Sequence, residues 1–107
     1  MTRAGGPRGG RTSKPRRLQW SARARRDLLD IGDYIARDDP AAAQRFVDAL
    51  IEKAEIAGRM PSSGRVVPEI GRDDVRELIH GRYRIVYQIE AATVEILTVF
   101  HGAQQLR

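Results

Sequence analysis

Hydrophobic positions follow two different periods along the chain, and the period changes after residue 60. Between residues 21 and 60, apolar side chains recur every three or four positions, which is the pattern of amphipathic α-helices. From residue 75 to residue 101 they recur at every second position, which is typical of β-strands with one buried face. The pattern therefore predicts a helical first part and a sheet in the second part.

Two helices joined by a tight turn are expected in the helical part. Ser21 is a good N-cap for the first helix, and Pro40 ends it because proline disfavours helical geometry in the residue before it. Asp39 then caps the second helix, with Pro40 as its first residue, and Pro61 ends that helix near Met60. Each helix has one apolar stripe: Ala24, Leu28, Ile31 and Ile35 in the first, and Phe46, Leu50, Ala54 and Ala57 in the second.

Three strands are expected at residues 75–80, 85–90 and 94–101, preceded by a short edge strand at 18–20 before the first helix. The links at 80–82 and 90–92 are too short for crossover helices, so the three strands are predicted to be antiparallel hairpins. The fold class is α+β, in the order β-α-α-β-β-β, with a helical hairpin packed on an antiparallel sheet. The other face of that sheet is predicted to stay partly open for a partner.

Charge divides the chain into two parts. Residues 1–17 carry six of the 19 basic side chains and no acid, while the rest holds 13 basic and 14 acidic side chains. With almost no apolar side chains, residues 1–17 are predicted to be a disordered basic arm. This arm either steers the protein to nucleic acid or has no role, and the second interpretation is favoured. Residues 18–107 are expected to form one domain that is about neutral.

Composition excludes several kinds of site. Without cysteine the chain has no disulfide, no thiolate metal ligand and no cysteine nucleophile, and two histidines are too few for an expected metal site. The sequence contains no nucleotide-binding loop, so we expect neither a metal nor a cofactor. No apolar run approaches the roughly 20 residues that span a bilayer, so we expect a cytoplasmic protein with no membrane partner.

The order and spacing of these segments resemble one known family. Nearly the whole body of the chain contributes, and the segment YRIVY at 83–87 is the sharpest single piece. The other family-like stretches are LQWSARARRDLLDIGDYIA, DDPAAAQRFVDAL, MPSSGRVVPEI, VRELIHGRYRIVYQIE and VEILTVFHGAQQL. Together they resemble the ParE/RelE superfamily of toxins from bacterial type II toxin–antitoxin systems, and its ParE-like branch in particular.

The resemblance implies a growth-inhibiting toxin that forms a hetero-oligomer with a cognate antitoxin protein. ParE-like members of the family poison DNA gyrase, whereas RelE-like members cleave mRNA on the ribosome. We expect the ParE-like function, without enzymatic activity, and take gyrase as the target from the family alone. The alternatives are a RelE-like ribosome-dependent mRNA endonuclease and a toxin that has kept only antitoxin binding and operon regulation.

RNA cleavage through the 2′-OH needs a base, an acid and cations that converge on one phosphate. The side chains that the sheet offers for this are Arg65, Arg76, His80, Tyr83, Arg84 and His101. Gly102 and Ala103 follow His101, where nuclease members often have another reactive or basic side chain. We therefore expect no catalytic residues, and we keep Arg76, His80, Arg84 and His101 as the site of the endonuclease alternative.

The antitoxin is expected to lay an extended, partly helical segment across the helical hairpin and the sheet. The first helix offers Ile31, Tyr34 and Ile35 beside charged side chains, and such a mixed strip suits a helix-in-groove partner. Tyr83 and Tyr87 complete the predicted antitoxin site. Because they share a parity on one strand, core packing is the expected use of at least one of them.

Overall fold

The computed structural model describes residues 14–103, and most of the predicted N-terminal arm therefore lies outside the described residues. The first strand begins at Arg17, one residue earlier than the predicted start of the domain. The elements are β1 (Arg17–Trp20), α2 (Ala22–Ala36), α3 (Pro40–Arg59), the 3-10 helix η1 (Pro61–Ser63), β2 (Arg65–Val66), β3 (Val75–His80), β4 (Tyr83–Ile89) and β5 (Thr93–His101).

The strands form one five-stranded sheet in the order β1-β5-β4-β3-β2. The predicted antiparallel pairing of β3, β4 and β5 is confirmed, with a two-residue turn at Gly81 and Arg82 between β3 and β4. Strand β1 is an edge strand, as predicted, but it pairs in parallel with β5, so the sheet is mixed. The short strand β2, which the sequence pattern did not indicate, adds to the other edge, antiparallel to β3.

Both predicted helix caps are present. The Ser21 hydroxyl accepts a hydrogen bond from the Ala24 amide at 2.9 Å, and the Asp39 carboxylate accepts one from the Ala42 amide at 3.1 Å. Each satisfies a backbone donor that the first turn of a helix leaves without a partner. The two helices therefore begin where the sequence predicts, which sets the length of the hairpin.

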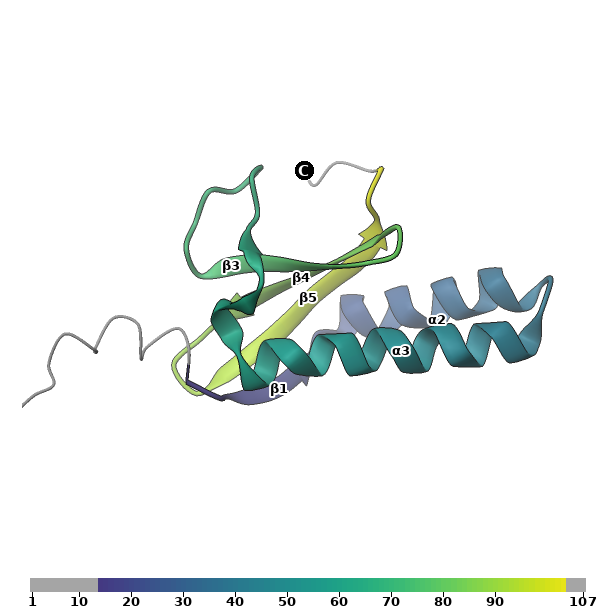
Figure 1. Cartoon of the computed structure of the whole chain (residues 1–107), viewed down its shortest axis with the longest axis horizontal. Coiled ribbons are helices and arrows are strands. Elements are labelled where there is room, and N and C mark those ends of the chain that lie inside the picture. The colour runs from purple at the N-terminus through teal and green to yellow at the C-terminus, as the bar shows by residue number, and fades with distance from the viewer. Residues whose placement is uncertain (1–13, 104–107) are drawn as a thin grey trace, which may run out of the picture.

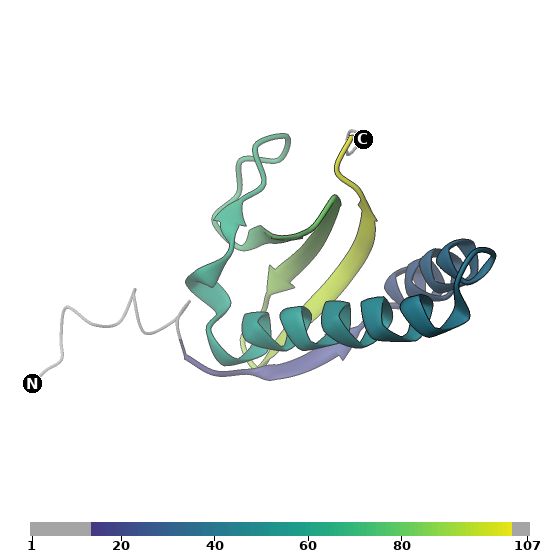
Figure 2. The same cartoon turned by 45° about the vertical axis from the view of Figure 1, so that its right-hand side comes forward.

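Helices α2 and α3 lie side by side against one face of the sheet, and the far end of their hairpin extends beyond the strands (Figure 1). Figure 2 shows the same two layers from another side, with the sheet curving above α3. The predicted apolar stripes of both helices face this sheet, which confirms the helical periodicity. The buried members of the main core are Ala24, Ile31, Leu50, Ala54, Ala57, Ile85, Tyr87, Ile89, Val94, Ile96 and Val99.

A smaller apolar cluster lies on the opposite face of the sheet. Val67, which follows β2, is fully buried there against Val75 and Val86. Leu97 and Phe100 pack around these three residues. The face that was predicted to be partly open is thus partly covered by the chain between β2 and β3.

A β-bulge in β5 ties the sheet to α2. Val86 is paired with Thr98 while the next residue, Tyr87, is paired with Ile96, so β5 has one extra residue between them. One carboxylate oxygen of Asp27 accepts hydrogen bonds from the Thr98 hydroxyl at 2.6 Å and from the Val99 amide at 2.9 Å. A bulge changes which residues of a strand face the core, and here it places Val99 in the main core.

Within residues 14–103, no helix is long and apolar enough to cross a membrane. The same residues contain no group of three or more His, Cys, Asp or Glu side chains that is arranged to hold a metal ion.

Candidate functional site

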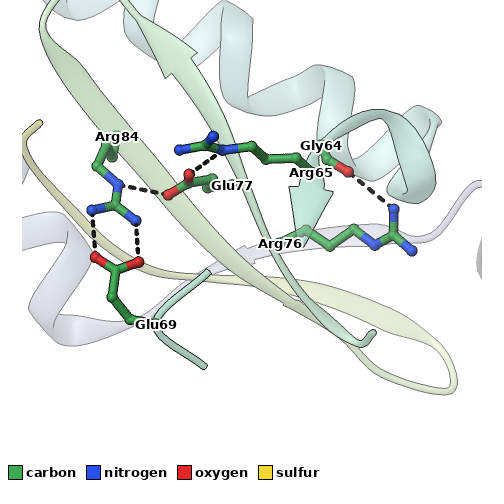
Figure 3. Close-up of polar contacts among 6 residues, drawn as sticks. All are labelled: Gly64, Arg65, Glu69, Arg76, Glu77 and Arg84. Carbon is green, nitrogen blue, oxygen red and sulfur yellow. Dashed lines mark hydrogen bonds and ion pairs between the residues drawn. The ribbon is translucent and has the colours of Figure 1, made fainter. Parts of the chain in front are cut away.

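Arg76, one of the candidate residues of the endonuclease alternative, has its guanidinium bound to other groups of the same domain. Its guanidinium donates to the carbonyl oxygens of Asp73 and Gly64, both at 3.0 Å, and to that of Ser62 at 3.3 Å. It also forms an ion pair with the Asp73 carboxylate at 2.8 Å. Figure 3 shows its contact with Gly64. Arg76 therefore fastens the chain before and after β2, and its side chain is only 15% exposed.

Arg84 is engaged even more completely. Its Nε donates to Glu77 at 2.6 Å, and its two terminal nitrogens donate to the two carboxylate oxygens of Glu69, each at 2.9 Å (Figure 3). The guanidinium also lies 5.1 Å from the centre of the Phe100 ring. The hydrogen bonds that Arg84 donates to Glu69, and then to Glu77, raise the pKa of Arg84 above its usual range, although burial opposes the shift. Arg84 therefore stays positively charged, and its charge serves to bind Glu69 and Glu77 within the fold.

Glu77 is the centre of this arrangement. Its side chain is fully buried, and it accepts hydrogen bonds from Arg84 on one side and from Arg65 at 2.5 Å on the other (Figure 3). A buried carboxylate costs several kcal/mol unless it is paired, so the two arginines are what allows Glu77 to be there. We call the chain Arg65–Glu77–Arg84–Glu69 the charge network.

The two histidines lie in a different environment, on the helix-facing side of the sheet. Tyr83 contacts both the His101 ring, with centroids 5.6 Å apart, and the Phe46 ring of α3 at 5.4 Å. Phe46 also contacts His80 at 5.3 Å. In addition, Nδ1 of His101 accepts a hydrogen bond from the Ala103 amide at 3.2 Å. Both histidines thus take part in one row of rings.

The four endonuclease candidates are therefore not gathered around one point. Arg76 and His80 share a face of β3, but four residues of strand separate their Cα atoms by about 13 Å. Tyr83 and Arg84 are neighbours in β4 and point to opposite faces, so the Arg84 guanidinium lies across the sheet from the row of rings. His80 and His101 are brought together only through Tyr83 and Phe46.

The five residues predicted to bind an antitoxin are also in different places. Tyr34 is 64% exposed, with Arg37 over its ring, and Tyr83 is half-buried. Ile31 is buried in the main core and Ile35 packs against it, so these two side chains face the sheet. The strip predicted on α2 is thus mostly the inner face of that helix.

Tyr87 lies entirely inside the protein, which corrects its expected surface position. Its hydroxyl donates to the Pro61 carbonyl oxygen at 2.6 Å and accepts from the Gly64 amide at 2.9 Å. Burial raises the pKa of this phenol. The structure places Tyr87 in the core, the use expected for at least one of the two tyrosines, and leaves none of its ring for a partner.

A groove on the outer side of the helical hairpin was not predicted. It has a volume of about 550 Å³ and is lined by Leu28, Leu29, Gly32 and Ala36 of α2 and by Ala43 and Val47 of α3, among others. The sequence did contain a sign of this groove, because residues 29, 32 and 36 form a second apolar strip on α2 with helical spacing. Leu29 is 68% exposed, so this hairpin groove has an apolar rim that no other described part of the chain covers.

A second hollow lies where the β3–β4 turn meets the end of β5. This turn pocket has a volume of about 350 Å³ and is lined by Arg65, Ile79, Arg82, Arg84, His101 and Gly102, together with their neighbours Gly81, Tyr83 and Ala103. None of these lining residues is acidic. The pocket is therefore a basic hollow with one large aliphatic side chain.

Comparison with known proteins gives a consistent result. Residues 18–106 match the family model described as the ParE toxin of type II toxin–antitoxin systems, parDE. The chain is 42% identical over 93 residues to Y4kP of Sinorhizobium fredii, whose name describes it as a candidate toxin, covering 84% of this chain and 92% of that protein. It is 33% identical over 85 residues to toxin RelE2 of Caulobacter vibrioides, covering 79% and 93%.

Two solved structures share the fold. The chromosomal ParDE system of P. aeruginosa aligns with a TM-score of 0.69 at 21% identity, over 80% of this chain and 95% of that one. The RelBE2 toxin–antitoxin complex of Mycobacterium tuberculosis aligns with a TM-score of 0.61 at 28% identity, over 85% and 95%. With the family match covering the whole body of the domain, the chain belongs to the ParE toxin family and is a toxin of a type II toxin–antitoxin system of the ParE/RelE superfamily.

Proposed function

We propose that this toxin acts as ParE-like members do, by binding and inhibiting DNA gyrase without cleaving RNA, and that a cognate antitoxin neutralises it. The observation that carries the proposal is that both arginines kept for the endonuclease alternative, Arg76 and Arg84, are occupied within the protein. Arg76 is bound to three carbonyl oxygens and Asp73, and Arg84 is bound to Glu69 and Glu77.

A phosphate that is about to be cleaved needs cations with free donors close to the base and the acid. Releasing Arg84 for that task would leave the buried Glu77 with one arginine instead of two. Losing a partner of a buried charge costs about 3–5 kcal/mol, which a binding site for RNA would have to offset. The charge network therefore supports a structural role for Arg84 and weakens the endonuclease alternative.

Gyrase is the target that the ParE-like resemblance implies, and a direct assay tests it. Purified toxin is added to gyrase in supercoiling and cleavage-complex assays, and in parallel to a translation reaction in which mRNA ends are mapped. We expect loss of supercoiling with accumulated cleavage complexes, and intact mRNA. If mRNA is cut during translation while gyrase keeps its activity, the proposal is wrong and the endonuclease alternative replaces it.

The hairpin groove is the proposed site of the antitoxin. An amphipathic helix binds in a groove through apolar side chains at helical spacing, and Leu28, Leu29 and Val47 offer such a surface. Arg25 and Asp33 also line the groove and provide charged groups that orient a partner helix. Of the residues predicted from sequence, Tyr34 remains exposed on the same helix, while Ile31 and Ile35 support it from the core side.

Leu29→Glu tests the groove, because it places a charge where an apolar helix would dock. We expect at least a tenfold weaker Kd for the antitoxin encoded beside the toxin, measured by calorimetry with both proteins purified. Met60→Glu is the matched control, since Met60 is 58% exposed and does not line the groove. If the wild-type protein and Leu29→Glu bind the antitoxin with equal affinity, the antitoxin does not bind in this groove.

A further inference from the structure

We propose that the turn pocket is the surface through which the toxin binds its target, and that its ligand is an acidic segment of the target protein. A carboxylate would lie between Arg65 and Arg82, and a neighbouring apolar side chain would lie on Ile79. This inference rests on the proposed function, because it names the surface that such inhibition would use.

The two arginines offer guanidinium donors that the protein does not use. Arg82 is exposed, and within residues 14–103 its side chain has no hydrogen bond or ion pair. Arg65 gives only its Nε to Glu77, and its two terminal nitrogens have no partner in the described part of the chain. Guanidinium groups with free donors bind carboxylates through paired, charge-assisted hydrogen bonds.

The electrostatic balance of the pocket favours an anion. Glu77, the carboxylate below it, is fully buried and is already shared between Arg65 and Arg84. Arg82 therefore adds a positive charge that no acidic side chain of the pocket lining balances. Residues 18–107 are about neutral as a whole, so this surplus is a local feature of the pocket.

Ile79 decides what kind of anion fits. It is 47% exposed, and β2, which begins at Arg65 opposite Glu77, does not extend alongside it. An acidic protein segment can place a carboxylate on the arginines and an apolar side chain on this isoleucine. A nucleic-acid backbone has phosphates for the arginines and offers the isoleucine little, so the apolar contact favours a protein ligand.

The pocket is built on ordered backbone. Gly81, with φ of +59°, allows the two-residue turn that carries Arg82, and the Gly102 amide donates to the Arg82 carbonyl oxygen at 2.5 Å. Arg65 is held by its bond to Glu77, as Figure 3 shows. Donors that are already positioned lose less entropy on binding, which strengthens recognition.

The turn pocket and the hairpin groove have no lining residue in common. Variants in the pocket are therefore expected to separate toxicity from antitoxin binding. We propose Arg82→Glu, which reverses the unbalanced charge, and Ile79→Thr, which removes the apolar contact from a strand residue while keeping β-branching. Arg59→Glu is the charge-matched control, because Arg59 is exposed on α3 and outside both surfaces.

Each full-length variant is measured for growth arrest, for inhibition of gyrase supercoiling and for Kd with the antitoxin. We expect at least a tenfold loss of both inhibitory effects in Arg82→Glu and a smaller loss in Ile79→Thr. Arg59→Glu should match the wild type, and antitoxin affinity should stay within twofold throughout. A thermal melt followed by circular dichroism checks folding, with Arg82→Ala as the second variant where the charge reversal fails to fold.

Three results would overturn the inference, and they are distinguishable. If both pocket variants fold and inhibit fully, the target does not bind at this surface. Loss of antitoxin binding along with toxicity shows that the pocket belongs to the antitoxin site. Crosslinking of wild-type protein, but not Arg82→Glu, to a single-stranded RNA oligonucleotide identifies a nucleic-acid ligand. If the wild-type toxin does not inhibit gyrase, the proposed function is wrong. The growth assay of the same variants still tests the pocket in that case, because it measures toxicity whatever the target is.

Discussion

At the scale of single residues, Gly64 and Tyr87 show how closely this small domain is packed. A Cβ atom on Gly64 would lie 2.5 Å from the Tyr87 hydroxyl oxygen and 2.6 Å from the Glu77 carbonyl oxygen. Glycine is therefore required here by close approach of neighbouring atoms, and its backbone φ is an ordinary one. The hydroxyl of Tyr87 fills this space and joins η1 to the sheet through Pro61 and Gly64.

Tyr87→Phe should cost about 1–3 kcal/mol of unfolding free energy at neutral pH, because it leaves the Gly64 amide and the Pro61 carbonyl without their buried partner. The measurement is urea denaturation. Tyr34→Phe is the control, since Tyr34 is 64% exposed. A loss below about 0.5 kcal/mol would show that water replaces the hydroxyl.

The same tyrosine predicts a pH dependence. Because burial raises the pKa of Tyr87, the unfolded chain releases this proton at a lower pH than the folded protein does. Its contribution to stability is then complete below the ordinary tyrosine pKa of 10.0 and is lost as the pH rises above it. We expect the stability difference between the wild type and Tyr87→Phe to narrow as the pH rises above 10.0, and a constant difference would contradict this explanation.

At the scale of elements, the bulge in β5 is a point where α2 is hydrogen-bonded to the sheet. One carboxylate oxygen of Asp27 in α2 accepts hydrogen bonds from the Thr98 hydroxyl and from the Val99 amide. Helix α2 is therefore bound to β5 at the bulge, where the alternation of inward and outward side chains shifts by one residue.

Asp27→Ala should destabilise the protein by about 1.5–3 kcal/mol, because hydrogen bonds to a charged group are lost and the Val99 amide is left without its acceptor. Hydrogen exchange measured by NMR should show faster exchange of that amide than in the wild type. The matched control is Asp30→Ala, an exposed aspartate on the same helix without a described contact. Unchanged exchange at Val99 would mean that the bulge holds without α2.

At the scale of the whole molecule, the helices and the sheet share one main core. Leu50 of α3 is fully buried among residues of α2, β4 and β5, and Trp20 of β1 packs against the same cluster. Neither layer can bury its apolar face alone. The domain is therefore expected to unfold in one cooperative step.

Leu50→Ala should cost about 2–5 kcal/mol, through lost burial and the cavity that remains. Circular dichroism at 222 nm reports the helices, and fluorescence of Trp20, the one tryptophan of the chain, reports the sheet edge. We expect both signals to shift together to lower urea, while Leu29→Ala, at an exposed position, shifts neither by more than about 0.5 kcal/mol. Separate transitions for the two signals would contradict a single core.

Local interactions explain why much of the fold was predictable from the sequence. Ser21 and Asp39 cap helices through amides three residues away, and Gly81 makes a turn within its own hairpin. The stripes of α2 and α3 and the alternation in β3, β4 and β5 follow from the periods of the elements themselves. The sequence by itself therefore determined α2, α3, β1, β3, β4 and β5, the order of these elements and the inward faces of the two helices, since each depends on residues near one another in the chain.

Tertiary structure alone decided what depends on residues far apart in the chain. The parallel pairing of β1 with β5 joins residues 76 positions apart, such as Arg17 and Thr93. The ion pairs of Arg84 join β4 to Glu77 in β3 and to Glu69 in the loop before β3. Burial of Tyr87, occupation of Arg76 and the shapes of the hairpin groove and the turn pocket belong to the same class. A residue's type and parity do not specify which distant partner satisfies its charge or covers its face, and that is why the binding surfaces emerged only with the assembled molecule.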